Sequence, residues 1–128
     1  MTTRNWLPDE SLVLVVAGSV VARKEAEENH RYVCQNRRSF RPSKWIAFYA
    51  DGQIDLYAEI DGPPEDDVAL GRPDEDKNSV FRLINLRTIG PIVNDQSRDG
   101  RAVGWTFGHR YTQIDKLLKA KRTSELTD

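Results

Sequence analysis

Two short stretches of the chain combine aromatic rings with arginines, and these residues are the best suited to bind a ligand. The first covers residues 37–41 and reads Arg-Arg-Ser-Phe-Arg, and the second covers residues 105–111 and reads Trp-Thr-Phe-Gly-His-Arg-Tyr. Aromatic faces stack on nucleobases, and guanidinium groups donate hydrogen bonds to phosphates and base edges. The combination is therefore typical of base or nucleotide recognition. The alternative is that Phe40, Trp45 and Trp105 belong to the core while the arginines are solvated.

Metal-dependent and nucleophilic chemistry has weaker support in the sequence. His30, Cys34 and His109 are the only histidines and cysteine, whereas a structural zinc site needs four ligands and a catalytic one usually three plus water. No Gly-x-Ser-x-Gly, P-loop or Gly-x-Gly-x-x-Gly motif occurs, and Cys34 has no Cys-x-x-Cys partner. A PD-(D/E)xK nuclease would need a lysine that residues 55–61 do not supply. We therefore predict no metal, no cofactor and no catalytic residue.

The charge of the chain is nearly balanced but unevenly distributed. A formal net charge of −1 argues against bulk, sequence-blind adhesion to nucleic acid, which normally needs a basic excess. Residues 30–44 nevertheless carry five Arg or Lys and no acid, and residues 98–122 carry seven basic residues against two acids. Residues 61–76 carry seven acids against one arginine. A specific pocket with basic walls is therefore compatible with the sequence.

Length and composition indicate one domain covering residues 1–128. A chain of 128 residues is large enough for a hydrophobic core without disulfides or metal. A single cysteine, Cys34, excludes an internal disulfide and fits a reducing compartment. No apolar run approaches the length of a membrane span, and the first ten residues lack the apolar segment of a signal peptide. We expect a cytoplasmic protein with no membrane partner.

A β-hairpin is predicted over residues 44–59, directly after the first aromatic–basic stretch. Asp51-Gly52 is a two-residue turn signal, and the flanking runs are rich in Trp, Ile, Phe and Tyr. With this turn, Ala50 would pair with Gln53 and Tyr49 with Ile54. The pairing would continue residue by residue, with Phe48 opposite Asp55, as far as Lys44 opposite Glu59. The predicted core face consists of Trp45, Ala47, Tyr49, Ile54, Leu56 and Ala58. The opposite face, which must be covered by a helix or bind a partner, consists of Lys44, Ile46, Phe48, Asp55, Tyr57 and Glu59.

The first helix is predicted to follow a buried strand. Residues 12–16 are a continuous apolar, β-branched run, which is typical of a strand covered on both faces. Gly18 permits a sharp turn, and Ser19 is a good N-cap for a helix over residues 20–34. Its expected buried residues are Val20, Val21, Ala26, Tyr32 and Val33.

The rest of the chain adds further strands and a closing helix. Strands are expected over residues 80–86 and 102–107. Between them, residues 86–93 are expected to bend at Gly90-Pro91 before or during a further short strand. The acidic, proline-containing residues 61–78 are predicted to form a mobile loop. Thr112 and Asp115 resemble a capping box, which predicts that the closing helix begins there. The helix would bury Tyr111, Ile114, Leu117 and Leu118 on one face. Five or six strands with these two helices define a mostly β domain of the α+β class.

The order of these elements resembles the PUA-like superfamily, which includes the EVE, ASCH and SRA-type modules. The resemblance rests on the first strand ending at Gly18-Ser19 and passing into a helix, and on the hairpin strands Trp45-Ile-Ala-Phe-Tyr-Ala50 and Gln53-Ile-Asp-Leu-Tyr-Ala-Glu-Ile60. It also rests on the closing stretch from Arg110 to Leu126. Similar strand phrases recur in PUA-like sensor modules of bacterial restriction and defence proteins. The match covers most of residues 11–126.

The resemblance implies a small, bent β-barrel closed by helices, and a non-catalytic module that binds nucleic acid, often a modified or flipped-out base. The acidic residues 61–76 depart from a duplex-gripping surface, so a small ligand or single nucleotide remains open. Carried onto this chain, the resemblance implies that the ligand is bound by Ser19, Arg38, Ser39, Phe40, Trp45, Tyr49, Trp105, Arg110 and Tyr111.

Two other functions stay open at this stage. One is a protein-interaction or regulatory subunit, either a homodimer or a partner of a larger defence-system protein, which would use the Ile46/Phe48/Tyr57 face. The other is a small nuclease of the ASCH kind, with Lys44, Arg110 and Tyr111 as candidate acid–base or phosphate-binding groups.

Overall fold

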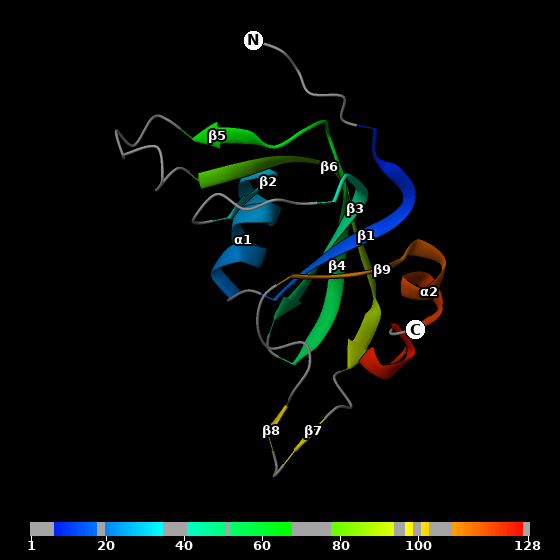
Figure 1. Cartoon of the computed structure of the whole chain (residues 1–128). Helices are drawn as coiled ribbons and strands as arrows, with labels where there is room; N and C mark the ends of the chain where they lie inside the picture. Colours follow the sequence, from blue (N-terminus) through cyan, green and yellow to red (C-terminus); the bar gives the residue numbers. More distant parts are fainter. Residues whose placement is uncertain are drawn as a thin grey trace.

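The computed structural model describes residues 7–17, 20–34, 41–50, 52–67, 78–93, 97–98, 101–102 and 109–126. They form a mostly β domain of the α+β class with two α-helices (Figure 1). The first half of the chain contains β1 (Asp9–Ala17), α1 (Val20–Asn29), β2 (Arg31–Cys34), β3 (Ser43–Ala50), β4 (Gln53–Ile60) and β5 (Glu65–Asp67). The second half contains β6 (Asn78–Val93), β7 (Ser97–Arg98), β8 (Arg101–Ala102), β9 (His109–Gln113), α2 (Ile114–Lys119) and the 3₁₀-helix η2 (Thr123–Leu126).

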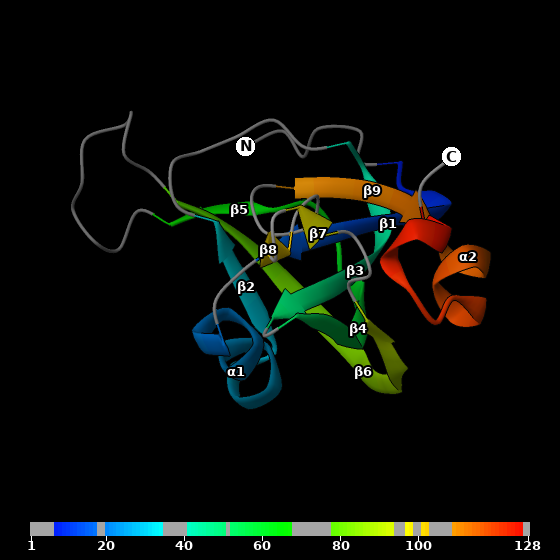
Figure 2. The same cartoon turned by 90° about the horizontal axis from the view of Figure 1, so that it is seen from below.

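Seven strands form one mixed sheet in the order β2-β6-β4-β3-β1-β9, with β5 also paired to β6. The β1–β3 pair is parallel, and the other pairs of this sheet are antiparallel. The sheet is strongly curled, and α1 and α2 lie on different sides of it (Figure 2). Within the described part of the chain, the strand order ends at β2 and β9, and no pairing joins these two strands. The structure therefore supports a mostly β fold without closure of a barrel.

Both sides of the central strands are buried. The α1-side cluster contains Leu14, Val16, Ala26, Tyr32, Ile46, Phe48, Leu56, Ala58, Ile60, Phe81 and Leu83. The α2-side cluster contains Val13, Val15, Ala47, Tyr49, Ile54, Tyr57, Ile92, Leu117 and Leu126. Alternate residues of β1 enter the two clusters because successive side chains of a strand point to opposite faces. This confirms the prediction of a strand over residues 12–16 that is covered on both faces.

The central hairpin has the predicted turn but not the predicted register. Ala50 pairs with Gln53 and Tyr49 with Ile54 as expected, and Gly52 has the positive φ of 82° that the turn requires. Phe48 then pairs with Leu56 instead of Asp55. Asp55 is thus an extra residue, a β-bulge that the sequence gives no direct sign of. Every predicted pair from Phe48 back to Trp45 is therefore wrong by one position.

The bulge redistributes the two faces of the hairpin. Leu56 and Ala58 join Phe48 in the α1-side cluster, whereas Tyr57 joins Ala47 in the α2-side cluster. The expected Ile46/Phe48/Tyr57 face does not exist, because its members point to opposite sides of the sheet and each is at most 7% exposed.

The first helix is shorter than predicted, because it ends at Asn29 and residues 31–34 form β2. His30 reverses the chain in a left-handed conformation with φ of 53°, and its amide donates to Ala26 O. Tyr32 then packs edge-on against Phe48 and in a stacked arrangement on Phe81. These long-range aromatic contacts, which sequence periodicity does not show, favour a strand at this point.

The strands predicted over residues 80–86 and within residues 86–93 both exist, but they form one continuous strand, β6, which runs past Gly90-Pro91. Within the described part of the chain, β6 remains paired with β4 beyond Arg82, whereas its pairing with β2 ends at that residue. A proline is tolerated on such an edge because its missing N–H breaks no pairing. Residues 65–67, expected to lie in a loop, form β5. Part of the expected strand at 102–107 lies outside the described residues, and Ala102 belongs to the β7–β8 hairpin.

The closing helix starts one residue later than predicted, because Thr112, the expected N-cap, belongs to β9 together with Tyr111 and the observed N-cap is Gln113. Tyr111 and Thr112 both pair with β1. Thr112 does not cap the helix: its hydroxyl donates to Leu126 O at 2.8 Å, and the N-cap Gln113 makes no side-chain capping bond. Leu117 is buried as expected, but Leu118 is 54% exposed. None of the helices described is long and apolar enough to span a membrane.

Candidate functional site

The two aromatic–basic stretches meet in space through Arg41 and Tyr111. The backbone amide of Arg41 donates to the Tyr111 hydroxyl at 3.0 Å, across 70 positions of sequence. The guanidinium carbon of Arg41 lies 5.1 Å from the centroid of the Tyr111 ring, within the range of a cation–π contact. One end of each stretch therefore contributes to the same surface.

Both partners in this contact are held by the fold. Tyr111 lies on β9, half-buried against the α1-side cluster. Arg41 is exposed and lies two residues before the start of β3. Pro42 O accepts a bond from the Asp9 amide, and the buried Ser43 hydroxyl donates to Arg41 O at 2.9 Å. Ser11 donates two bonds to Asp9, which lower the pKa of Asp9, and the charge of Arg41 adds to this effect. A guanidinium group can stack on an aromatic ring through its face and donate hydrogen bonds through its edge.

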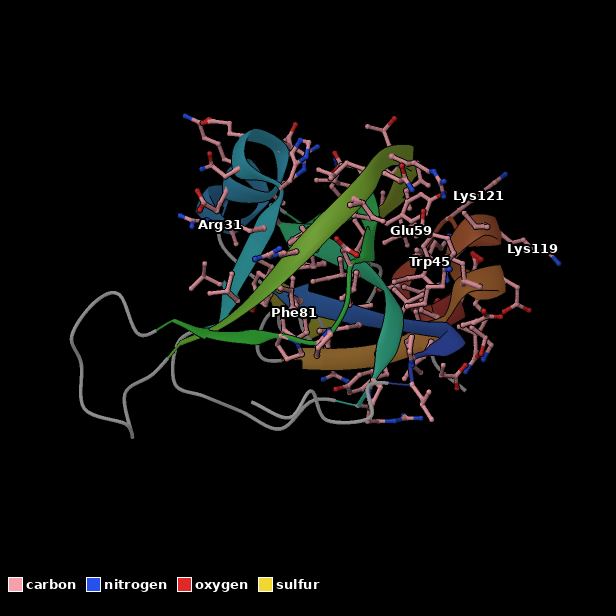
Figure 3. All side chains as sticks on the ribbon, turned by 90° about the horizontal axis from the view of Figure 1, so that it is seen from above. Arg31, Trp45, Glu59, Phe81, Lys119 and Lys121 are labelled. Carbon is pink, nitrogen blue, oxygen red and sulfur yellow. The ribbon has the colours of Figure 1, made fainter. Side chains whose placement is uncertain are left out.

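A second aromatic–basic arrangement, the Trp45 cluster, lies on the α2 side of the sheet. Its members are Lys44, Trp45, Tyr57, Glu59, Asn85 and Arg87. The guanidinium carbon of Arg87 lies 5.7 Å from the Trp45 ring centroid and 6.0 Å from that of Tyr57. The Lys44 ammonium lies 5.8 Å from the Trp45 ring. Figure 3 shows Trp45 and Glu59 side by side between β6 and α2.

Glu59 joins the cations of this cluster. Its carboxylate lies 3.5 Å from the Lys44 ammonium and 3.6 Å from the Arg87 guanidinium, and the Asn85 amide donates to it at 2.6 Å. The Asn85 bond lowers the pKa of Glu59, burial opposes this, and the charges of Lys44 and Arg87 add to the lowering. Glu59 is thus held ionised at the centre of the cluster.

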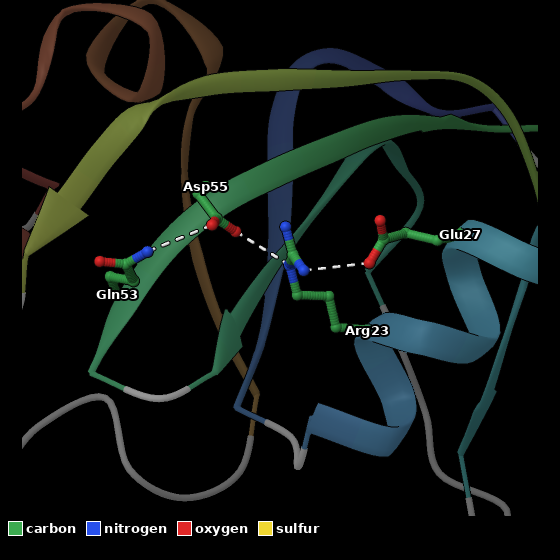
Figure 4. A network of polar contacts seen from close by, with 4 residues as sticks. All are labelled: Arg23, Glu27, Gln53 and Asp55. Atoms are coloured by element: carbon green, nitrogen blue, oxygen red, sulfur yellow. Dashed lines mark hydrogen bonds and ion pairs between the residues drawn. The ribbon is translucent and has the colours of Figure 1, made fainter.

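A third polar network fixes α1 on the hairpin. Arg23 donates to Asp55 at 2.9 Å and to Glu27 at 3.0 Å, and the Gln53 amide donates to Asp55 at 3.2 Å (Figure 4). Each charged group has a partner, and no aromatic ring takes part. We interpret this network as structural.

The predicted site residues fall into separate places. Arg110 and Tyr111 are neighbours on β9 and so point to opposite faces. Trp45 belongs to the α2 side, and Tyr49 is only 6% exposed within the α2-side cluster. Ser19, Arg38, Ser39, Phe40 and Trp105 lie outside the described residues.

Sequence reasoning missed four members of the Trp45 cluster as site residues: Tyr57, Glu59, Asn85 and Arg87. Strand register alone brings them together, since Trp45 pairs with Glu59, and Tyr57 with Arg87. The alternation of side chains along the hairpin strands indicates which residues share a face of the sheet, but the Asp55 bulge shifts this alternation by one residue.

Among the described residues, no group of three or more His, Cys, Asp and Glu side chains is arranged to hold a metal ion. No protein-family model matches the chain, and neither a curated protein nor a solved structure matches it significantly.

Proposed function

We propose that this chain is a non-catalytic binding module for a nucleobase or nucleotide, free or within a nucleic acid, and that Arg41 and Tyr111 form the site. The contact between Arg41 and Tyr111 carries the proposal. It brings together a fixed aromatic ring and an exposed guanidinium from two stretches whose composition suits base recognition. A base would stack on the Arg41–Tyr111 pair, because guanidinium planes and aromatic rings both present faces to nucleobases.

The proposal extends to the fold and to the rest of the site. The curled sheet with one helix on each side is compatible with a bent, PUA-like barrel, in which Arg38, Ser39, Phe40 and Trp105 would complete the pocket. The ligand would include modified bases of the kind sensed by defence-associated modules. The protein would then work in the cytoplasm as the binding subunit of a nucleic-acid-directed system.

Equilibrium binding with fluorescent nucleotides and short single strands tests the proposal. Replacing Tyr111 by alanine should weaken binding by about 10-fold or more, because one base–aromatic stack contributes roughly 1–3 kcal/mol. Tyr111→Phe keeps the ring and should retain most of the affinity. Lys24→Ala, an exposed change on α1, is the matched control. Equal affinity of the wild type and Tyr111→Ala, with both variants folded, would refute the site.

The structure supports the two alternative functions, an interaction subunit and a nuclease, less well. An interaction subunit would need another surface, because the Ile46/Phe48/Tyr57 face is buried. Light scattering coupled to size exclusion tests for a homodimer. For a nuclease, Lys44 contacts Glu59 and Trp45, whereas Tyr111 contacts Arg41, so the three candidate groups do not form one described cluster. Incubation of labelled RNA and DNA with EDTA and then with Mg²⁺ tests this alternative by cleavage.

A further inference from the structure

The Trp45 cluster has the construction of a second stacking site, separate from the Arg41–Tyr111 pair. The indole of Trp45 is half-buried, and its Nε1–H donates to Glu10 O at 2.8 Å. The buried Tyr57 ring lies 5.9 Å from it, tilted by 49°. An aromatic ring fixed in this way offers a face or edge at little entropic cost to a ligand, because no rotamer must be ordered on binding.

Two cations are held beside this ring. Lys44 and Arg87 both lie over Trp45, and their side chains are 36% and 47% exposed. Only one carboxylate, that of Glu59, contacts them among the described residues, so the cluster keeps one net positive charge. Aromatic stacking beside exposed Lys and Arg is the arrangement that single-stranded nucleic acid binding uses for base and phosphate.

The backbone around Asn85 supports a built arrangement rather than a chance contact of surface residues. Asn85 has a φ of 53° in the middle of β6, where the register with β4 shifts between Tyr57 and Glu59, and asparagine adopts this left-handed conformation more readily than most residues other than glycine. The left-handed turn accompanies the bond from the Asn85 amide to Glu59. Glu59 in turn positions both cations. Bulges of this kind are over-represented at sheet edges and next to functional sites.

The two aromatic sites are close along the chain. Arg41 and Trp45 are four residues apart at the start of β3, so their Cα atoms are separated by at most about 14 Å. Tyr111 packs with the α1-side cluster and Trp45 with the α2-side cluster. The two sites therefore lie on opposite sides of the same strand end.

From this arrangement we infer that the ligand is a single-stranded nucleic acid whose bases occupy both the Arg41–Tyr111 site and the Trp45 cluster. The inference rests on the proposed function and names its ligand class. Stacked bases in a duplex expose no face to either ring, so a single strand fits and a duplex does not. Two linked contacts raise the apparent affinity of an oligonucleotide above that of a mononucleotide, because the second contact forms intramolecularly.

The test compares thymidine and uridine monophosphates with oligothymidylates and oligouridylates of increasing length, by fluorescence polarisation and calorimetry. Wild-type affinity should rise by about 10-fold or more once the strand reaches both sites. The double substitution Lys44→Gln with Arg87→Gln should remove most of this gain, while mononucleotide binding at the Arg41–Tyr111 site persists. Trp45→Ala should act in the same way. Because Trp45 packs on the core, the double substitution carries the test if Trp45→Ala does not fold.

The outcomes separate this inference from the proposed function. If mononucleotides bind at the Arg41–Tyr111 site but length adds no affinity, or the gain survives the Lys44 and Arg87 changes, the inference is wrong and the proposed function stands. If oligonucleotide binding depends on the Trp45 cluster and not on Tyr111, the Arg41–Tyr111 site is wrong. If neither a mononucleotide nor an oligonucleotide binds, both the inference and the proposed function are wrong. A duplex that binds as tightly as the single strand also overturns the inference.

Discussion

Arg23 of α1 and Asp55 of β4 form an ion pair at 2.9 Å, and Asp55 is the bulged residue of the central hairpin. The helix and the bulge are thereby coupled, since the bulge adds a residue whose carboxylate meets the helix. Leu56 and the residues after it then take the register that gives both faces of β4 a hydrophobic environment.

Asp55→Ala should lower the free energy of unfolding by about 1 kcal/mol, because both side chains are only 27–28% exposed and the pair is better ordered than a fully solvated one. Chemical denaturation measures the change. Glu27→Ala removes the more exposed partner of Arg23 and serves as the matched control, with an expected loss of about 0.3–0.5 kcal/mol. A larger loss for Glu27→Ala would show that Asp55 does not anchor the helix.

Local sequence pattern predicts the strands of this fold better than their limits and register. Residues 12–16 are a continuous apolar run and residues 80–86 are mostly apolar, and both stretches form strands. Local pattern places Tyr32 in the helix expected over residues 20–34, and the spacing of Thr112 and Asp115 makes Thr112 a helix N-cap. Their contacts with Phe81 and Leu126, distant in sequence, decide otherwise. The Asp55 bulge is likewise stabilised by Arg23, on another element.

The same distinction applies to the candidate site. The composition of residues 37–41 and 105–111 favours one shared binding surface for the two stretches. Arg41 from the first stretch and Tyr111 from the second are in contact. The Trp45 cluster could not be predicted in this way, because Glu59, Asn85 and Arg87 are brought to Trp45 only by the pairing of β3, β4 and β6. A one-residue error in that register moves each side chain to the other face.

Thr112→Val should destabilise the protein by about 1–2 kcal/mol. The substitution keeps the shape of the side chain but leaves the buried Leu126 carbonyl without the 2.8 Å bond from the Thr112 hydroxyl, and an unsatisfied buried acceptor costs its desolvation. Thermal and urea unfolding measure the loss. Thr88→Val on the exposed side of β6 is the control and should stay within about 0.5 kcal/mol. Equal effects would show that the hydroxyl does not tie η2 to β9.

Stability should fall more steeply with acid in the wild type than in Glu59→Gln. The pKa of Glu59 is lowered in the folded protein from its ordinary value of 4.5. A carboxyl with a lowered folded pKa contributes stability above its unfolded pKa, and that contribution is lost as the pH falls through the folded value. The difference between the two proteins should therefore shrink below about pH 4.5. Urea unfolding over a pH series measures it, with Glu28→Gln, an exposed change on α1, as the control. A constant difference down to pH 3 would contradict the assigned role of Glu59.

His30→Gly should raise stability by about 0.5–1 kcal/mol. His30 is exposed and has a φ of 53° at the junction between α1 and β2, a conformation that costs an L-residue about 1–2 kcal/mol and glycine almost nothing. The greater freedom of glycine in the unfolded chain offsets part of this gain. His30→Val, with a branched side chain at the same position, should destabilise, and Asn29→Gly, one residue earlier within the helix, should also destabilise. Thermal unfolding of the three variants measures the order. If His30→Gly and Asn29→Gly lower the melting temperature equally, the left-handed residue does not limit the stability of the α1–β2 junction.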